Sequence, residues 1–288
     1  MFVNVARFLL ITLSFSLGAC TSLWQAASSS NTRDGVSSSL VDYLYPKGEV
    51  PPPRTEDIPR LDLPLRAGIA FVPSAHRTNS GITEATKSEL LNKVKAAFKD
   101  REYIEHIEVI PETYLRSSKG FEGMQQVARL YGVDVMALVS YDQVSIADDT
   151  KASVLYWTIV GAYFIEGTKN EVQTFVDTAV FDVPTRKLLF RAPGIDKRES
   201  RSTAIESSET LRQERANSFG SAMEEMTVSL SGELDVFEER LESEPQLAEV
   251  KWDESKGGGG SLHISLVVLL GLAGVTRRRA KTRARSPR

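Results

Sequence analysis

Few residues in this chain have the types and spacing that catalysis or metal binding requires. Its only cysteine is Cys20, and its three histidines, His76, His106 and His263, lie far apart. A structural zinc site needs several Cys or His ligands at close spacing, so we expect no metal site and no bound cofactor. The sequence also contains no glycine-rich phosphate loop, nucleophile elbow or Ser-x-x-Lys motif. We therefore expect no catalytic residues and a protein that is not an enzyme.

Cys20 directly follows a segment with the composition of an export signal. Arg7 supplies a positive charge, and the apolar stretch at 8–15 is too short to span a bilayer permanently. A single cysteine forms no intramolecular disulfide, so in an exported chain it needs another use. The residues that end the segment are Leu17, Gly18, Ala19 and Cys20.

These four residues resemble a bacterial lipobox, in which an aliphatic residue and two small residues precede a cysteine. The resemblance implies cleavage between Ala19 and Cys20, a thioether from Cys20 to diacylglycerol, and acylation of the new amino group. Thr21 stands where lipoproteins retained in the inner membrane often carry Asp, which implies the outer membrane as destination. The alternative is an ordinary secretory signal followed by a buried cysteine.

The C-terminus has three parts in a fixed order. A glycine run is followed by an apolar stretch from Ser261 to Val275 and then by a basic stop. The run and the stop consist of Gly257, Gly258, Gly259, Gly260 and of Arg277, Arg278, Arg279. Glycine costs about 1 kcal/mol in a helix relative to alanine, so this end of a membrane helix unwinds easily. The arginines favour the cytoplasmic side, which places the rest of the chain in the periplasm.

This tail resembles the GlyGly-CTERM sorting signal, the substrate signal of the rhomboid-type protease rhombosortase. With a lipobox at one end and this signal at the other, the chain resembles the rhombotarget lipoprotein family. The resemblance implies an inner-membrane precursor, cleavage between Gly257 and Ser261, and a mature form at the outer membrane or cell surface. Its partners would be membrane lipid, the prolipoprotein-processing enzymes and rhombosortase. The alternatives are a permanent C-terminal anchor, or a linker to a buried helix.

The charge of the chain is unevenly distributed. The formal net charge of −3 includes 35 basic and 38 acidic residues, but 8 of the basic residues lie in 1–20 and 261–288, which contain no acid. The remaining 27 basic and 38 acidic residues give the body a net charge of −11. An acidic body argues against nucleic acid or anionic lipid as its main partner.

The middle of the sequence predicts a single α/β domain, with α+β as the alternative. Apolar runs at 67–73, 107–110 and 133–144 predict strands, and the segments 83–100 and 120–131 predict amphipathic helices between them. Thr83 is a candidate N-cap and Gly132 a candidate C-cap. The β-α-β-α-β order favours strands that are at least partly parallel.

The second half of the domain predicts a β-hairpin at 174–183 and 187–192, followed by a long amphipathic helix at 202–243. The helix carries an apolar stripe that we expect to pack within the chain, with association between chains as the alternative. The stretch from Val154 to Ile165 is the most apolar internal segment. It predicts buried structure, or alternatively a loop that contacts a membrane or a partner.

These patterns divide the chain into five parts. They are a signal peptide at 1–19, a lipidated Ser/Pro-rich tether at 20–65, the α/β domain at 66–245, a Gly-rich cleavage region at 246–260, and a short membrane helix with a basic tail at 261–288. The leading functional hypothesis is a non-enzymatic lipoprotein that binds a protein or an envelope component. The alternatives are an envelope hydrolase and a subunit of a secretion or assembly complex.

Overall fold

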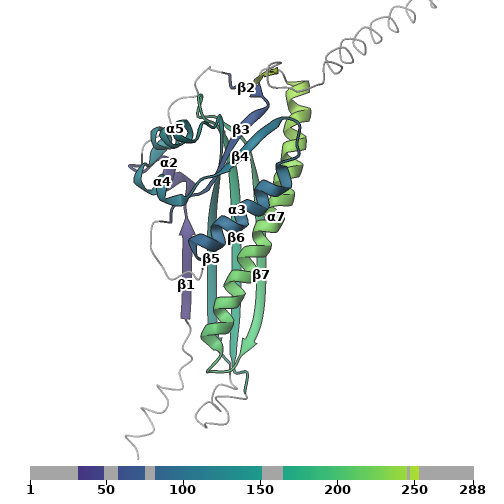
Figure 1. Ribbon diagram of the computed structural model, residues 1–288. Helices are drawn as coiled ribbons and strands as arrows, with labels where there is room; N and C mark the ends of the chain where they lie inside the picture. The colour runs from purple at the N-terminus through teal and green to yellow at the C-terminus, as the bar shows by residue number, and fades with distance from the viewer. Residues whose placement is uncertain (1–31, 49–57, 75–81, 151–164, 245–246, 253–288) are drawn as a thin grey trace, which may run out of the picture.

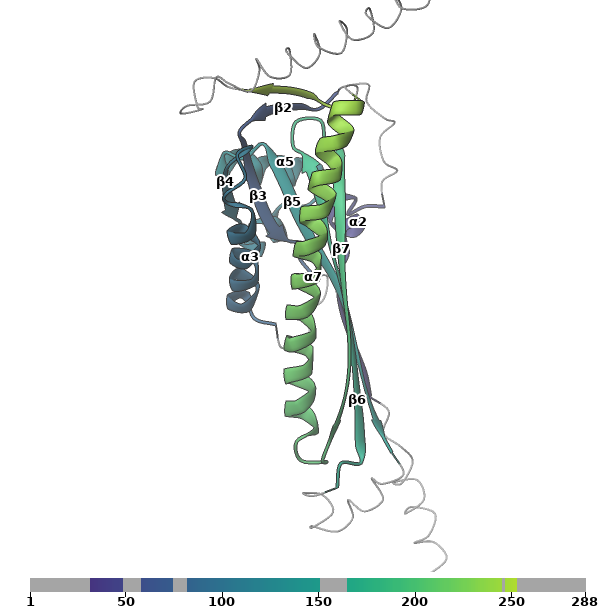
Figure 2. The same ribbon diagram turned by 90° about the vertical axis from the view of Figure 1, so that its right-hand side faces the viewer.

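A long twisted sheet forms the centre of the computed structural model, which describes residues 32–48, 58–74, 82–150, 165–244 and 247–252 (Figures 1 and 2). Its strands follow the order β4-β3-β5-β6-β7, and β1 pairs with the part of β5 that β3 does not reach. A separate ladder joins β2 and β8 in parallel. The strands are β1 (Thr32–Ser38), β2 (Arg60–Leu63), β3 (Leu65–Phe71), β4 (Ile104–Val109), β5 (Val135–Asp149), β6 (Thr168–Asp182), β7 (Leu188–Ser202) and β8 (Glu249–Trp252). The helices are α2 (Leu40–Leu44), α3 (Glu84–Phe98), α4 (Glu112–Ser117), α5 (Gly120–Tyr131) and α7 (Ser207–Ser243).

The first half of the sheet has the β-α-β-α-β order that the sequence predicts. β3 pairs in parallel with β4 and with β5, and α3, α4 and α5 lie in the connections. The Thr83 hydroxyl caps α3 by accepting a hydrogen bond from the Thr86 N–H, and α5 ends at Gly132 in the left-handed region with φ of 65°. The α/β fold class and both predicted caps are confirmed.

The second half of the sheet is antiparallel and longer than predicted. β5, β6 and β7 are each 15 residues long. The hairpin predicted at 174–183 and 187–192 covers only the apolar part of the β6–β7 ladder. The outer half of this ladder was not predicted, because it carries charged side chains instead of an apolar alternation. There the Lys169 ammonium lies 3.2 Å from the Glu199 carboxylate, and that of Lys197 lies 2.9 Å from Glu171. Opposite charges on neighbouring strands support a ladder without an apolar pattern.

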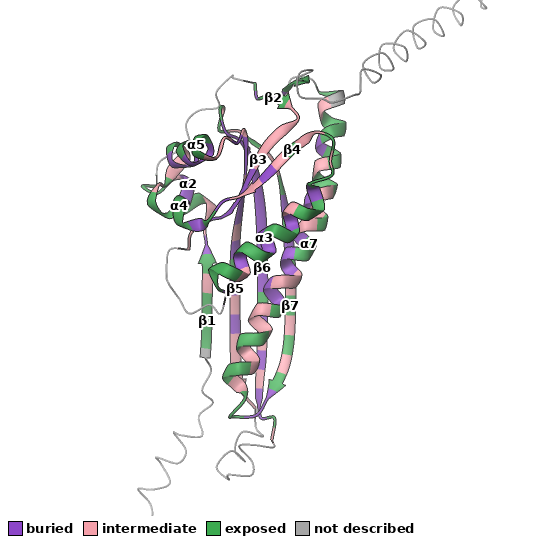
Figure 3. Cartoon of the chain, in the orientation of Figure 1, coloured by how far each residue is buried: buried purple, intermediate pink, exposed green. Residues whose placement is uncertain are grey.

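Helices cover the two faces of the sheet unequally. α3 and α7 lie on one face, whereas α2, α4 and α5 cover only part of the other (Figures 1 and 3). Each face has its own hydrophobic cluster, and the two clusters draw on residues from Tyr43 to Ala248. The larger cluster centres on the rings of Phe71, Tyr141 and Phe219, whose centroids lie 5.2 to 6.1 Å apart.

α7 packs on the sheet along its predicted apolar stripe. Phe219, Met223, Met226, Leu230 and Phe237 are buried, and Leu234 and Leu241 are partly buried. Packing within the chain is therefore confirmed as the role of this stripe. The helix begins at Ser207 rather than at the predicted 202, because Ser202 is the last residue of β7.

Both predicted boundaries of the folded domain are wrong. The expected tether at 20–65 contains β1, a strand of the main sheet, and α2, in which Tyr43 and Leu44 are buried. The Tyr43 hydroxyl donates to the carbonyl of Ser118 at 3.3 Å. At the other end, β8 continues the fold past residue 245. β1 has no apolar alternation, and the four residues of β8 alternate but are all exposed, so both strands are held mainly by backbone pairing with a neighbouring strand.

Candidate functional site

The residues predicted to direct processing lie outside the described part of the chain. They are Leu17, Gly18, Ala19, Cys20, Gly257, Gly258, Gly259, Gly260, Ser261, Arg277, Arg278 and Arg279. The predicted membrane helix at 261–288 lies outside it as well. None of the helices in the described ranges is both long enough and apolar enough to cross a membrane. The roles of the terminal residues stay predictions from the sequence.

The histidines do not come together with other potential ligands where the structure describes them. His106 lies on β4, half-buried, with its Nε2 atom 4.0 Å from the Glu108 carboxylate two residues further along the same strand. His76 and His263 lie outside the described residues. Among the residues that are described, no three His, Cys, Asp or Glu side chains gather closely enough to hold a metal ion.

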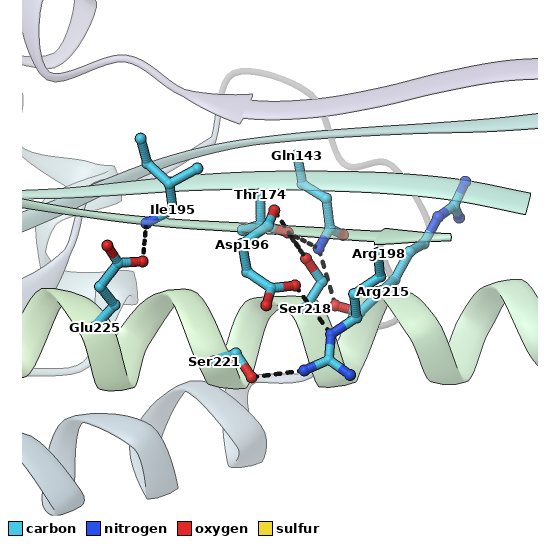
Figure 4. Close-up of polar contacts among 9 residues, drawn as sticks. All are labelled: Gln143, Thr174, Ile195, Asp196, Arg198, Arg215, Ser218, Ser221 and Glu225. Carbon is cyan, nitrogen blue, oxygen red and sulfur yellow. Dashed lines mark hydrogen bonds and ion pairs between the residues drawn. The ribbon is translucent and has the colours of Figure 1, made fainter. Parts of the chain in front are cut away.

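An extended set of polar contacts lies between the sheet and the first half of α7 (Figure 4). We call this set the polar seam: Gln143, Ser145, Thr174, Asp196, Arg198, Arg215, Ser218 and Ser221. At its centre, the Gln143 side-chain amide donates to the Thr174 hydroxyl at 2.8 Å and to the Arg215 carbonyl at 2.9 Å. The Thr174 hydroxyl also lies 2.7 Å from that of Ser218, and both residues are fully buried. Three elements therefore share one buried hydrogen-bonded group.

Two arginines continue the polar seam toward solvent. Arg198 on β7 donates to the Asp196 carboxylate at 2.9 Å and to the Ser221 hydroxyl at 2.7 Å. Arg215 on α7 donates to Ser145 and, at 2.9 Å, to the carboxylate of Asp34 on β1. Because these contacts join β1, β5 and β7 to one helix, they fix the position of α7 along the sheet.

A hollow of about 390 Å³ adjoins the polar seam between α3 and α7. Glu89 and Lys93 line it from α3, Asn217 and Glu224 line it from α7, and Arg198 reaches it from β7. Its lining combines acidic and basic side chains with uncharged hydroxyl and amide groups. Such a lining suits a polar ligand held by hydrogen bonds, and it lacks a nucleophile paired with a base.

A buried ion pair lies where β3 and β4 end. The Lys87 ammonium of α3 donates to the Glu112 carboxylate of α4, and both side chains are almost fully buried. The ammonium also lies 5.7 Å from the ring centre of Phe71 and 5.4 Å from that of Tyr141. Burial lowers the pKa of Lys87, but Tyr141 and Glu112 raise it by more, so the net shift is upward. A lysine that stays protonated is a poor nucleophile or general base, so this pair is suited to bracing the fold.

A second hollow, of about 340 Å³, lies beside the β2–β8 ladder. The guanidinium of Arg66 donates to both carboxylate oxygens of Asp134, at 2.8 and 2.9 Å, and Asp62 and Lys251 add further charges. Trp252, 53% exposed, completes the lining. This combination offers an aromatic face beside charged groups, which is suited to binding rather than to covalent chemistry.

Sequence reasoning missed the polar seam, although one signal for it was present. Gln143 and Ser145 have the same alternation phase on β5 as the buried residues Val139 and Tyr141. Polar residues in core phase predict buried hydrogen bonds, because an unpaired buried polar group is costly. Their partners on α7 could not be assigned from the sequence, since that pairing depends on how the helix crosses the sheet.

Comparisons with known proteins give only remote similarities. No family model matches the chain, and no curated protein matches it. Among solved structures, it is similar to a PelC dodecamer subunit from Paraburkholderia phytofirmans, with 13% identity and a TM-score of 0.26 over 67% of this chain and 99% of that chain. It is also similar to protein XCC0632 from Xanthomonas campestris, of the family DUF330, with 8% identity and a TM-score of 0.29 over 65% of this chain and 95% of that one. Values this low say nothing about what this chain does.

Proposed function

We propose that this chain is an exported lipoprotein of the rhombotarget type that binds a protein or an envelope component and is not an enzyme. It is acylated on Cys20 and trimmed between Gly257 and Ser261 by a rhomboid-type protease, rhombosortase. The inner-membrane precursor then becomes a mature protein at the outer membrane or cell surface. The observation that carries the proposal is the pairing of a lipobox at the only cysteine with a glycine–apolar–basic tail.

The position of the hydrophobic core supports the interpretation of the two chain ends as sorting signals. The two hydrophobic clusters are built from residues between Tyr43 and Ala248, all of which lie between the two signals. The described chain begins in β1 and ends in the ladder of β2 with β8, and the start of β1 lies at the opposite end of the molecule from β2 (Figure 1). This arrangement supports the interpretation of the segments before Thr32 and after Trp252 as sorting signals rather than parts of the core.

The chemistry of the described residues supports a binding role. The polar seam consists of hydroxyl, amide, carboxylate and guanidinium groups that hydrogen-bond one another. Lys87, which is buried beside the rings of Phe71 and Tyr141, is held in its charged form by Tyr141 and Glu112. The two hollows have mixed charge and offer surfaces for a polar ligand, which an acidic body restricts to neutral or cationic partners.

The test is the covalent structure of the mature protein. We expect intact-mass analysis and C-terminal sequencing to give an acylated Cys20 at one end and a terminus between Gly257 and Ser261 at the other. Cells that lack the rhomboid-type protease should instead retain a chain ending at Arg288. In a Cys20→Ser variant, acylation should be lost while trimming at the other end persists. A mature chain that still ends at Arg288 in wild-type cells would refute the sorting signal, and an unmodified Cys20 would refute the lipobox.

A further inference from the structure

One face of the antiparallel part of the sheet is largely bare of helices among the described residues. α7 lies against the other face, where it contacts Tyr141, Gln143, Thr174 and Thr178. Because side chains alternate along a strand, the residues next to these point away from α7. α2, α4 and α5 cover only the half of this second face nearer to β3, and Figure 2 shows the outer half of β5, β6 and β7 with α7 on one side and no helix on the other. We call this uncovered half the open face.

An apolar strip crosses the open face. Phe175 on β6 and Ile195 on β7 form a cross-strand pair, and they are 36% and 51% exposed. Val144 and Ile146 on β5, both partly buried, continue the strip in one direction, and the exposed Pro193 on β7 continues it in the other. Contiguous exposed apolar side chains with polar residues around them mark a surface that binds another molecule.

Paired charges lie on both sides of the apolar strip. Toward the outer end of the sheet, two lysines and two glutamates form the cross-strand ion pairs described above. On the other side, the Arg191 guanidinium donates to both oxygens of the Asp177 carboxylate, at 2.9 and 3.2 Å. These six side chains sum to no net charge, and the exposed Asp142 adds a single negative charge. The open face is therefore close to neutral on an acidic body, so a second copy can approach it without strong repulsion.

Two other surfaces that could join copies of the chain are less suited to that role. The second half of α7 contains six acidic residues and no basic residue between positions 224 and 239, so two such helices repel each other. At the edge of the sheet, Pro193 has no N–H group, and the Ile195 N–H donates to the Glu225 carboxylate at 3.0 Å. The middle of this edge therefore offers no free donor to an added strand.

We propose that the open face is a self-association surface, on which a second copy of this chain packs sheet against sheet about a two-fold axis along the apolar strip. Such an axis places each residue of the strip against its own counterpart. It also places the lysine–glutamate pairs of one copy opposite the Asp177–Arg191 pair of the other. The proposal does not depend on acylation or trimming.

The size of the open face sets the expected strength of the dimer. From Arg191 to Glu199 is about 26 Å along β7, and the four strands β1, β5, β6 and β7 are about 19 Å wide together, which gives about 500 Å² for each copy. A total of about 1,000 Å² lies at the lower limit for a specific interface, so we expect a dissociation constant of about 1–100 μM.

The first test measures the mass of the full chain with Cys20→Ser, which lacks the acylation site and the only native thiol. In sedimentation equilibrium with density-matched detergent, the mass should rise from one chain to two between about 1 and 200 μM. Ile195→Lys places a charge at the centre of the strip in both copies and should raise the dissociation constant by at least about tenfold. Val228→Lys adds the same charge on the outer side of α7, at a residue 74% exposed, and should change the constant by less than about twofold.

Cysteines at the same two positions give a second readout that does not depend on tolerance of a lysine. With Cys20→Ser as background, Ile195→Cys lies beside its own counterpart in the dimer, so mild oxidation should link most chains in pairs. Val228→Cys should link few. A chain that stays monomeric over the whole concentration range overturns the proposal. So does a dimer that Ile195→Lys weakens no more than Val228→Lys does, or disulfide linkage at 195 no greater than at 228, because the contact then lies on another surface.

Discussion

The buried pair of Lys87 and Glu112 gives the sharpest prediction about stability. Lys87→Met leaves the Glu112 carboxylate buried with only Arg116, at 2.8 Å, as its remaining cation. Removing one member of a buried ion pair costs about 3–5 kcal/mol, and the retained arginine places the expected loss at the lower end, about 3 kcal/mol. Lys93→Met is the matched control on the same helix, because Lys93 and Glu89 are 61% and 69% exposed. It should cost less than about 1 kcal/mol in the same denaturant titration followed by circular dichroism.

The pH dependence of this loss has a definite sign. The net upward shift in the pKa of Lys87 means that its contribution is fully present below the unfolded-state value of 10.5 and disappears as pH rises through the higher folded value. The difference between wild type and Lys87→Met should therefore be constant near neutral pH and shrink above about pH 10.5. Adding Glu112→Gln to Lys87→Met should recover much of the loss, because the uncompensated charge is then gone. The reasoning is refuted if Lys87→Met costs no more than Lys93→Met, or if the second substitution deepens the loss.

Two further pairs of variants test how α7 is held on the sheet. Gly194→Ala on β7 should cost at least about 2 kcal/mol, because its Cβ would lie 2.1 Å from the Ala222 carbonyl oxygen. Gly220→Ala on α7 is the matched control: its Cβ would enter open space, so the substitution should stabilise the helix by up to about 1 kcal/mol. A Gly194→Ala variant with wild-type thermal stability would contradict the close approach. Thr174→Val should cost about 1–3 kcal/mol, because it removes the buried hydrogen-bond partner of Gln143 and Ser218. Thr178 is equally buried on the same strand but contacts only the Met226 thioether, so Thr178→Val should cost less than about 1 kcal/mol. Equal losses for the two threonines, measured by chemical denaturation, would show that the polar seam contributes nothing specific.

The sequence predicts the apolar part of this fold well and the polar part poorly. The helices that end at Phe98 and Tyr131 carry local signals, a threonine N-cap and a glycine C-cap, so their limits are predictable within a few residues. β1 carries no such signal, because its seven residues are held by backbone pairing with β5 and only Ser38 among those with known burial is buried. The outer halves of β6 and β7 also lack a strand signal in the sequence, because ion pairs between the strands replace the apolar alternation there.

The candidate functional residues differ in the same way: some can be predicted from a local motif, and others depend on tertiary structure. Cys20 and the segment from Gly257 to Ser261 are read from contiguous motifs, and no tertiary information is needed to propose their chemistry. The polar seam instead brings Gln143, Thr174 and Ser218 together from segments up to 75 residues apart in the sequence. Such a group becomes visible only once the register of β5 on β6 and the crossing of α7 are known.

The length of α7 explains how one helix stabilises the antiparallel part of the sheet from end to end. A helix of 37 residues is about 55 Å long, and a strand of 15 residues is about 50 Å long, so α7 supports β6 and β7 over almost their whole length.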